Sequence, residues 1–209
     1  VSRIQDGTIA QGAAISGSGA VPVLLTVKSP NAKREIQIAD FKTSKLFYEY
    51  LPTEFEITVK NTGNIHAAPV GDVFLDTMFN RENANLTVNT ARGNVLPNAS
   101  RVYQVTWDDG FAVVKPKETE DGEVVKNSAG ENEYKTKYDF AKADKFRFGK
   151  YTAHLLLVYD SGERDIPLEA TVSFWVIPWK ILAGVGIVVV LALAGIIGIL
   201  MSLVKKMRR

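Results

Sequence analysis

The chain has 209 residues and no cysteine, so disulfide bonds, thiolate metal ligands and a thiol nucleophile are excluded. Its formal net charge is +2, but five of its 25 basic residues lie beyond Trp179, which leaves 20 basic and 23 acidic side chains in residues 1–179. That net charge of −3 gives the first part of the chain no electrostatic support for a nucleic-acid partner.

The chain opens on residues rich in glycine, serine and alanine. We predict that residues 1–18 are a linker or the end of a preceding domain, because Ser16-Gly17-Ser18-Gly19 is typical of a flexible linker. No basic and apolar signal-peptide pattern precedes them. We therefore expect either a signal peptide that has been removed or, more in keeping with this stretch, a longer protein of which the chain is the C-terminal part.

Residues 19–176 read as a succession of short β-strands. Polar and apolar side chains alternate in residues 35–41, 55–60 and 102–107, which is the pattern of a half-buried strand. Further strands are predicted at residues 21–27, 73–75, 86–88, 151–159 and 168–175. Because parallel pairs would need helical crossovers, for which the sequence leaves no room, these strands predict an antiparallel β-sandwich.

Residues 108–148 interrupt this pattern as a charged insert. They carry ten acidic and eight basic side chains in 41 residues. Residues 111–114 and 134–138 are predicted to pair as a protruding hairpin, and residues 139–146 can form two helical turns. Insertions of this size are often functional and sometimes merely mobile, and the sequence leaves both open.

The C-terminal segment predicts a transmembrane helix over residues 177–204. Residues 181–204 carry no charge, and Ser202 is their one polar side chain. A helix of that length rises about 36 Å, enough to cross a hydrocarbon core about 30 Å thick. The short link from residue 168 to Trp179 leaves almost no flexible stem.

The flanks of this helix fit the two surfaces of a membrane. Tryptophan suits one interface and a basic tail at residues 205–209 suits the cytoplasmic side, so the preceding domain is expected outside the cell. The predicted membrane-interface residues are Trp175, Trp179, Lys180, Lys205, Lys206, Arg208 and Arg209.

Small side chains recur along one face of the predicted helix. Ala194, Gly198 and Ser202 follow one another every four residues, with Gly195 beside them. Small residues at this spacing allow a second helix to approach closely, although glycine and alanine are common in membrane helices in any case. We expect a candidate helix–helix contact here, and with it an oligomer formed through the helix.

The sequence contains no catalytic constellation. His66 lies in a predicted loop and His154 on the polar face of a predicted strand, and no metal-binding spacing links them. The carboxylates of Asp108 and Asp109, and the Asp121-Gly122-Glu123 stretch, fall in the charged insert, where they are more often solvated than catalytic or calcium-binding. We expect no catalytic residue, no metal site and no cofactor.

One segment resembles a known group of domains. Phe55, Ile57 and Val59 alternate with polar residues and run into Asn61-Thr62-Gly63-Asn64. This resembles the bacterial and archaeal immunoglobulin-like (Ig-like) surface modules of the CARDB/NEW3 type. The order of module, membrane helix and basic tail is similar to the C-terminal half of WxL-interacting-type surface proteins. The resemblance covers roughly residues 20–209, departs at the insert, and implies an all-β, Ig-like β-sandwich followed by one transmembrane helix.

These observations predict a non-enzymatic, single-pass bacterial surface protein. Its extracellular module, residues 19–176, would serve adhesion or envelope organisation. The expected partners are the lipid bilayer and another surface or membrane protein, with no nucleic acid. An alternative is an accessory subunit of a larger secretion, pilus or envelope assembly. A third, an envelope hydrolase, would need a catalytic domain before Val1.

Overall fold

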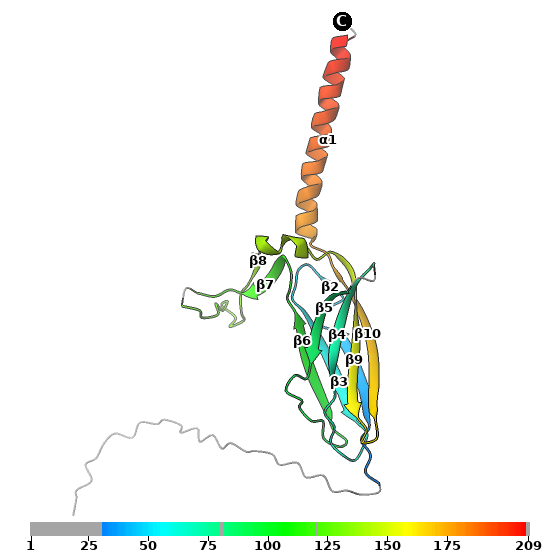
Figure 1. The fold of residues 1–209 in the computed structure, drawn as a ribbon. Coiled ribbons are helices and arrows are strands. Elements are labelled where there is room, and N and C mark those ends of the chain that lie inside the picture. The colour runs from blue at the N-terminus through cyan, green and yellow to red at the C-terminus, as the bar shows by residue number, and fades with distance from the viewer. Residues whose placement is uncertain (1–30, 80–81, 120, 208–209) are drawn as a thin grey trace, which may run out of the picture. The chain divides into compact units, whose positions relative to one another are not determined.

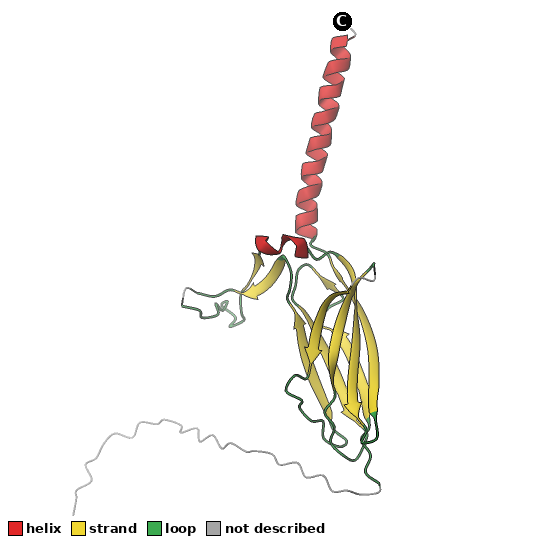
Figure 2. Cartoon of the chain, viewed as in Figure 1, coloured by secondary structure: helices red, strands yellow, loops and turns green. Residues whose placement is uncertain are grey.

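The computed structural model describes residues 31–79, 82–119 and 121–207, except for the side chains of residues 82–83, 202–204 and 206. The predicted linker of residues 1–18 and the predicted strand at residues 21–27 therefore lie outside the described residues. The described chain is mostly β-strand, with a long helix near its C-terminus (Figures 1 and 2).

The first sheet has three antiparallel strands. It consists of β1 (Ile36–Thr43), β3 (Thr53–Asn61) and β6 (Ser100–Trp107), with β3 in the centre. The register pairs Ile57 of β3 with Phe41 of β1 and with Tyr103 of β6. The strands predicted at residues 35–41, 55–60 and 102–107 are thus confirmed.

The second sheet has five strands in the order β2-β10-β9-β4-β5. They are β2 (Phe47–Tyr48), β10 (Asp165–Val176), β9 (Gly149–Asp160), β4 (Val70–Thr77) and β5 (Glu82–Val88). The four strands predicted at residues 73–75, 86–88, 151–159 and 168–175 are confirmed, three of them longer at both ends.

The purely antiparallel arrangement predicted from the sequence is wrong at one edge. The two residues of β2 pair in parallel with Trp175 and Val176 of β10. This pair needs no helical crossover, because the chain leaves β1 in one sheet, touches the edge of the other, and returns as β3. A two-residue strand has no alternation pattern to reveal it.

The core lies where the inner faces of both sheets meet. Phe55, Ile57 and Val59 of β3 are all 0% exposed, and Leu155 of β9 is 1% exposed. The ring of Phe55 packs edge-on to Phe174 of β10, with 5.6 Å between centroids. The alternation seen in the sequence therefore separates a buried face from a solvated one on each strand.

The turn after β3 is held by a buried asparagine. Asn61 is 0% exposed, and its Nδ2 donates to the carbonyls of Ile65, at 2.8 Å, and Val95, at 2.9 Å. Its Oδ1 accepts the Gly63 N–H at 2.9 Å. A Cβ at Gly63 would collide with the backbone of residues 33 and 35, which explains glycine there.

The charged insert has its own secondary structure. β7 (Ala112–Pro116) and β8 (Tyr134–Tyr138) form an antiparallel two-stranded sheet, which confirms the predicted hairpin. The segment expected to form two helical turns is η1 (Phe140–Lys145), two short 3-10 turns that meet at a kink at Lys142. Asp139 caps it, because its Oδ1 accepts the Ala141 N–H at 3.1 Å.

The C-terminal helix α1 (Trp179–Met207) follows β10 after two residues. It begins two residues later than residue 177, because Pro178 disfavours a helical conformation at Ile177. The Pro178 carbonyl accepts the Leu182 N–H at 3.0 Å, which starts the helix. At its other end α1 continues to Met207, since lysine and methionine are good helix formers.

Candidate functional site

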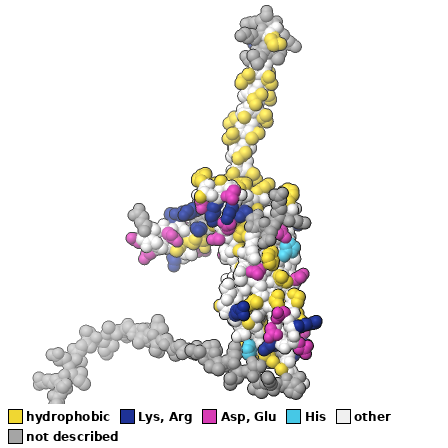
Figure 3. Space-filling model, viewed as in Figure 1, with side chains coloured by type: hydrophobic (Ala, Val, Ile, Leu, Met, Phe, Trp, Pro, Cys, Tyr) yellow, Lys and Arg dark blue, Asp and Glu magenta, His cyan; other side chains and the backbone are white. Residues whose placement is uncertain are grey.

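Helix α1 exposes apolar side chains on all sides. The 23 residues Trp179–Met201 form a stretch of which no part is buried. Leu191 is 67% exposed and Val188 65%, and Figure 3 shows hydrophobic side chains along the helix. Such a stretch rises about 34 Å. Helix α1 is therefore long and apolar enough to cross a membrane.

The small residues predicted to contact another helix lie on this exposed surface. Ala194 is exposed, and a Cβ built on Gly195 or Gly198 would meet nothing within 4 Å. The backbone of Ser202 continues α1, but its side chain lies outside the described part. The contact with a second helix remains a prediction.

Three of the predicted membrane-interface residues lie close together in the chain, where β10 is followed by α1. Trp175 is 38% exposed near the end of β10, and Trp179 is 58% exposed at the first position of α1. The ammonium group of Lys180 lies 3.0 Å from Glu49 Oε2 and 5.5 Å from the centre of the Trp179 ring. Lys180 thus links the first turn of α1 to the loop after β2.

The other predicted interface residues lie at the far end of α1. Lys205 is exposed in its last turn. The side chain of Lys206, and Arg208 and Arg209 entirely, lie outside the described residues. Their role at a membrane surface remains a prediction.

The strand register defines which parts of the domain lie nearest to α1. Val176, the last residue of β10, pairs with Tyr48 of β2 and Gly149 of β9. The backbone N–H of Ile177 then donates to the Tyr48 carbonyl at 2.7 Å. The end of the domain that contains β2 and the start of β9 is therefore the end from which α1 emerges, and we call it the helix end.

Exposed phenylalanines gather at the helix end, and the sequence analysis missed them. Within the described parts of the chain, all the phenylalanines classed as exposed belong to this group, which we call the aromatic rim. Their exposed fractions are 64% for Phe47, 78% for Phe79, 80% for Phe140, 39% for Phe146 and 54% for Phe148. Three phenylalanines in the charged stretch 140–148 were the available signal, since large apolar side chains are unusual there.

Strand pairing shows that Phe47, Phe79 and Phe148 lie at the helix end. Phe47 pairs with Trp175, and Phe148 directly precedes Gly149, which pairs with Val176. Thr77 pairs with Tyr151 of β9, so Phe79 follows β4 at the same end. A Cβ on Gly149 would lie 3.6 Å from the sulfur of Met78.

Ring contacts and ion pairs fix η1 and its phenylalanines. The ring of Phe111 lies 5.5 Å from that of Phe140 and 6.2 Å from that of Phe146. Asp109 forms ion pairs with Lys142, at 2.9 Å, and with Lys145, at 2.6 Å. Hydrogen bonds from Lys145 and then Lys142 lower the pKa of the Asp109 carboxyl group.

Arg147 also holds the insert to the domain. Its Nε donates to the Asp109 carbonyl at 2.9 Å, and its guanidinium lies 5.2 Å from the centre of the buried Trp107 ring. Cation–π contact of this kind joins η1 to the end of β6. Figure 3 shows charges of both signs gathered over the insert.

The hairpin of β7 and β8 is attached to the segment after β2 through Tyr50 and Leu51. Tyr138 Oη donates to Tyr50 Oη at 3.4 Å, and the Val114 N–H donates to the Leu51 carbonyl at 2.6 Å. Burial raises the pKa of the Tyr50 hydroxyl. The base of the insert is therefore part of the folded domain.

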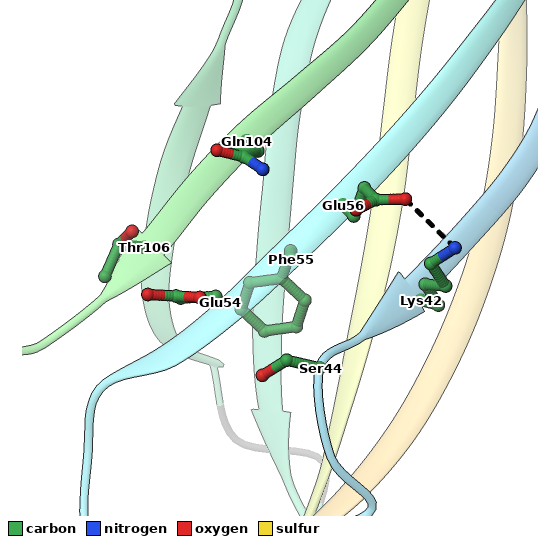
Figure 4. Close-up of a pocket in the computed structure, with 7 residues that line it drawn as sticks. All are labelled: Lys42, Ser44, Glu54, Phe55, Glu56, Gln104 and Thr106. Carbon is green, nitrogen blue, oxygen red and sulfur yellow. Dashed lines mark ion pairs between the residues drawn. The ribbon is translucent and has the colours of Figure 1, made fainter. Parts of the chain in front are cut away.

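Two depressions on the described surface are small and are lined mostly by charged and polar residues. One crosses the outer face of the first sheet, where the Lys42 ammonium lies 2.9 Å from Glu56 Oε1 (Figure 4). Its volume is about 140 Å³, and that of the other, beside β7 and β8, is about 100 Å³. Pockets for small molecules usually measure about 300–1,000 Å³. Neither depression resembles such a site.

The candidate catalytic and metal-binding residues do not converge. His154 is exposed on β9, with Nε2 3.5 Å from Asp76 Oδ2 and Nδ1 3.4 Å from Thr171 Oγ1. His66 lies in the loop before β4, and Asp121 and Glu123 are exposed in the insert. Over residues 31–79, 82–119 and 121–207, no three histidine or carboxylate side chains are grouped as metal ligands would be.

No family model matches the chain, and none of the curated proteins with which it was compared matches it either. The functional argument therefore rests on the helix, the helix end and their geometry.

Proposed function

We propose that the chain is a non-enzymatic, single-pass membrane protein that presents an Ig-like binding module close to the outer side of a bacterial membrane, for adhesion or envelope organisation. One observation carries this proposal. Only Ile177 and Pro178 separate the last strand of the folded domain from a helix that exposes apolar side chains all round. A domain attached in this way must stay near the membrane that the helix crosses.

The order of the strands supports an Ig-like sandwich. In Ig domains strands A, B and E share one sheet, and strands C, F and G share the other, with C′ added beside C in variable-type domains. Assigning β1, β3 and β6 to A, B and E, and β5, β4, β9 and β10 to C′, C, F and G, reproduces this order. The large buried tryptophan, Trp107, here comes from β6 and not from the strand assigned to C.

The same assignment favours the CARDB/NEW3-type resemblance. The alternating β3 and its Asn61 turn occupy the position of strand B and its following loop. The charged insert connects the strands assigned to E and F. Binding residues are often found on loops that a rigid scaffold positions, and for this reason we propose binding as the function.

The proposed orientation follows from the basic tail. In the sequence, Lys205, Lys206, Arg208 and Arg209 follow the apolar segment, on the side away from the domain. Positive charges next to a membrane helix are retained on the cytoplasmic side. The β-domain is then outside the cell.

The absence of cysteine allows a direct test of this topology. Single cysteines are introduced as Glu163→Cys, in the exposed turn between β9 and β10, and as Lys205→Cys in the last turn of α1. A membrane-impermeant maleimide is expected to label the first variant on intact cells, and the second only after permeabilisation. Labelling in the reverse order would contradict the orientation.

Membrane insertion is tested separately in the full chain. The wild type should remain in membranes washed with alkaline carbonate. Leu191→Lys places a charge at the helix centre, which disfavours insertion by about 2.5–3.5 kcal/mol, and should increase the extracted fraction. Leu191→Ala is the matched control. Complete extraction of the wild type would refute the anchor.

A second function is favoured by the open surface around Gly195 and Gly198. We propose as the alternative that the chain is an accessory subunit of a larger membrane or envelope assembly, which it joins through α1 and the domain. Gly198→Ile should then weaken association measured in a membrane, whereas Val189→Ile, on the opposite face of α1, should not. Unchanged association in both variants would remove this alternative.

A further inference from the structure

We propose that the aromatic rim docks on the bilayer that α1 crosses, with its phenylalanine rings at the boundary between lipid headgroups and acyl chains. The domain would then contact the membrane through its own surface and not only through its tether. This inference rests on the proposed function, because it requires α1 to span the bilayer.

The covalent connection brings the rim within reach of the membrane. Val176 stands three residues before Trp179, so their Cα atoms are at most about 11 Å apart. Cα atoms paired across antiparallel strands are about 5 Å apart. Phe148, next to the partner of Val176, therefore lies within about 20 Å of the first residue of α1, whatever the angle between helix and domain.

The rim is fixed to the domain as one surface. Phe47 belongs to β2, whose partner in the sheet is β10. Phe140 packs on Phe111, and Asp109 holds η1 through Lys142 and Lys145. Contact at one of these positions therefore brings the others toward the same plane.

The chemistry of the rim fits a lipid interface better than water. Phe79 and Phe140 are 78% and 80% exposed, and aromatic side chains are favoured at the boundary between membrane and water. The turn at the opposite end of β9 and β10 is instead Ser161-Gly162-Glu163-Arg164. Exposed phenylalanines thus gather at the end of the domain where the membrane would lie.

Charge does not select a particular lipid. Lys45 and Lys150 are exposed at the helix end, but so are Asp139 and Asp144 of the insert. We therefore expect docking through apolar contact, on neutral as well as on anionic bilayers. Strict dependence on an anionic lipid would contradict this assignment.

The test uses a fluorescent label placed beside the rim. Ala141→Cys, exposed next to Phe140, is labelled with an environment-sensitive dye. The full chain is reconstituted in phosphatidylcholine vesicles, with and without phosphatidylglycerol, that contain a headgroup-linked quencher. The label is expected to shift its emission to shorter wavelength and to be quenched in both vesicles. A label at Glu163→Cys, in the opposite turn, should show neither effect.

A second variant shows whether the phenylalanines cause the contact. Phe140→Ser and Phe148→Ser are combined with the Ala141→Cys label, and the circular dichroism spectrum checks that the fold is retained. Loss of quenching in this variant supports docking through the rim. Quenching that persists would assign the contact to the tether alone and overturn the proposal.

Failure of the inference is distinguishable from failure of the proposed function. Protection of α1 from protease in the same vesicles reports insertion independently of the label. If α1 is protected and the Ala141→Cys label stays in water, docking is wrong and the anchor stands. If α1 is not protected, both are wrong.

Discussion

Phenylalanines of this chain lie both in its interior and at its helix end. Phe55 and Phe174 are 0% exposed between the two sheets, whereas Phe79 and Phe140 are 78% and 80% exposed. The first two lie on inward faces of long strands, where the opposite sheet covers them. The rim residues lie at strand ends and in η1, where no second layer covers them. The same side chain stabilises the fold in one region and is available to an outside partner in the other.

Among the variants that test this comparison, Phe174→Ala is expected to lower the stability of the domain most. The ring of Phe174 packs against those of Tyr48, Phe55, Trp107 and Tyr151, so its removal leaves a cavity between the sheets. We expect the free energy of unfolding to fall by about 3–5 kcal/mol. Urea unfolding of the full chain in detergent, followed by tryptophan fluorescence, measures it. A loss below about 1 kcal/mol would contradict this account of the core.

A smaller loss of stability is expected from Asn61→Ala. The substitution removes two donors to buried or half-buried carbonyls and the acceptor for the Gly63 N–H. Buried groups left without partners cost about 1–3 kcal/mol each, part of which water entering the turn recovers. We expect a loss of about 2–3 kcal/mol in the same unfolding experiment.

The matched control for this turn is Asn64→Ala. Asn64 also makes side-chain hydrogen bonds, but it is exposed, so water can replace its partners. Its substitution should cost less than half as much as that of Asn61. Equal losses would mean that burial does not distinguish the two asparagines.

The sequence was sufficient to predict the strands of the interior. Alternation in β3 and β6, and the long apolar segments of β9 and β10, reflect burial between two sheets, which is a local signal repeated along each strand. The apolar helix was equally evident, because its length and lack of charge need no partner to be recognised.

The helix end could be predicted only in part. Trp175, Trp179 and Lys180 stand next to the apolar segment in sequence, so they were found. Phe47 and Phe79 reach the helix end only because β2 pairs with β10 and β4 pairs with β9. The paired residues Phe47 and Trp175 are 128 positions apart in the chain, and Thr77 and Tyr151 are 74 apart. The ion pairs of Asp109 were hidden because a charge-rich segment offers many equivalent partners.

Asp109→Asn tests how firmly η1 is held to the domain. The hydrogen bonds from Lys145 and Lys142 keep the pKa of Asp109 below its ordinary value of 3.8. A lowered pKa in the folded state means that the ion pairs stabilise the protein above about pH 4 and are lost as the pH falls through that pKa. Because the carboxylate is 37% exposed, we expect a contribution below about 1 kcal/mol.

The measurement compares thermal unfolding of the wild type and Asp109→Asn as a function of pH. Their difference in unfolding temperature should be greatest near pH 6 and should narrow below about pH 4. Asp144→Asn, also on η1, is the matched control. Its unfolding temperature should follow that of the wild type at every pH. A constant difference at all pH values would show that packing, and not charge, holds η1.

The smallest effect on stability is expected from Phe148→Ala. Its ring is 54% exposed, so folding buries little of it, and the free energy of unfolding should change by less than about 0.5 kcal/mol in the urea experiment. Phe174→Ala and Phe148→Ala remove the same atoms, so the difference between them measures burial alone. If both variants lost comparable stability, the rim would belong to the core of the domain. If only Phe174→Ala does so, the domain does not need the Phe148 ring to fold, and the ring is free to contact the bilayer.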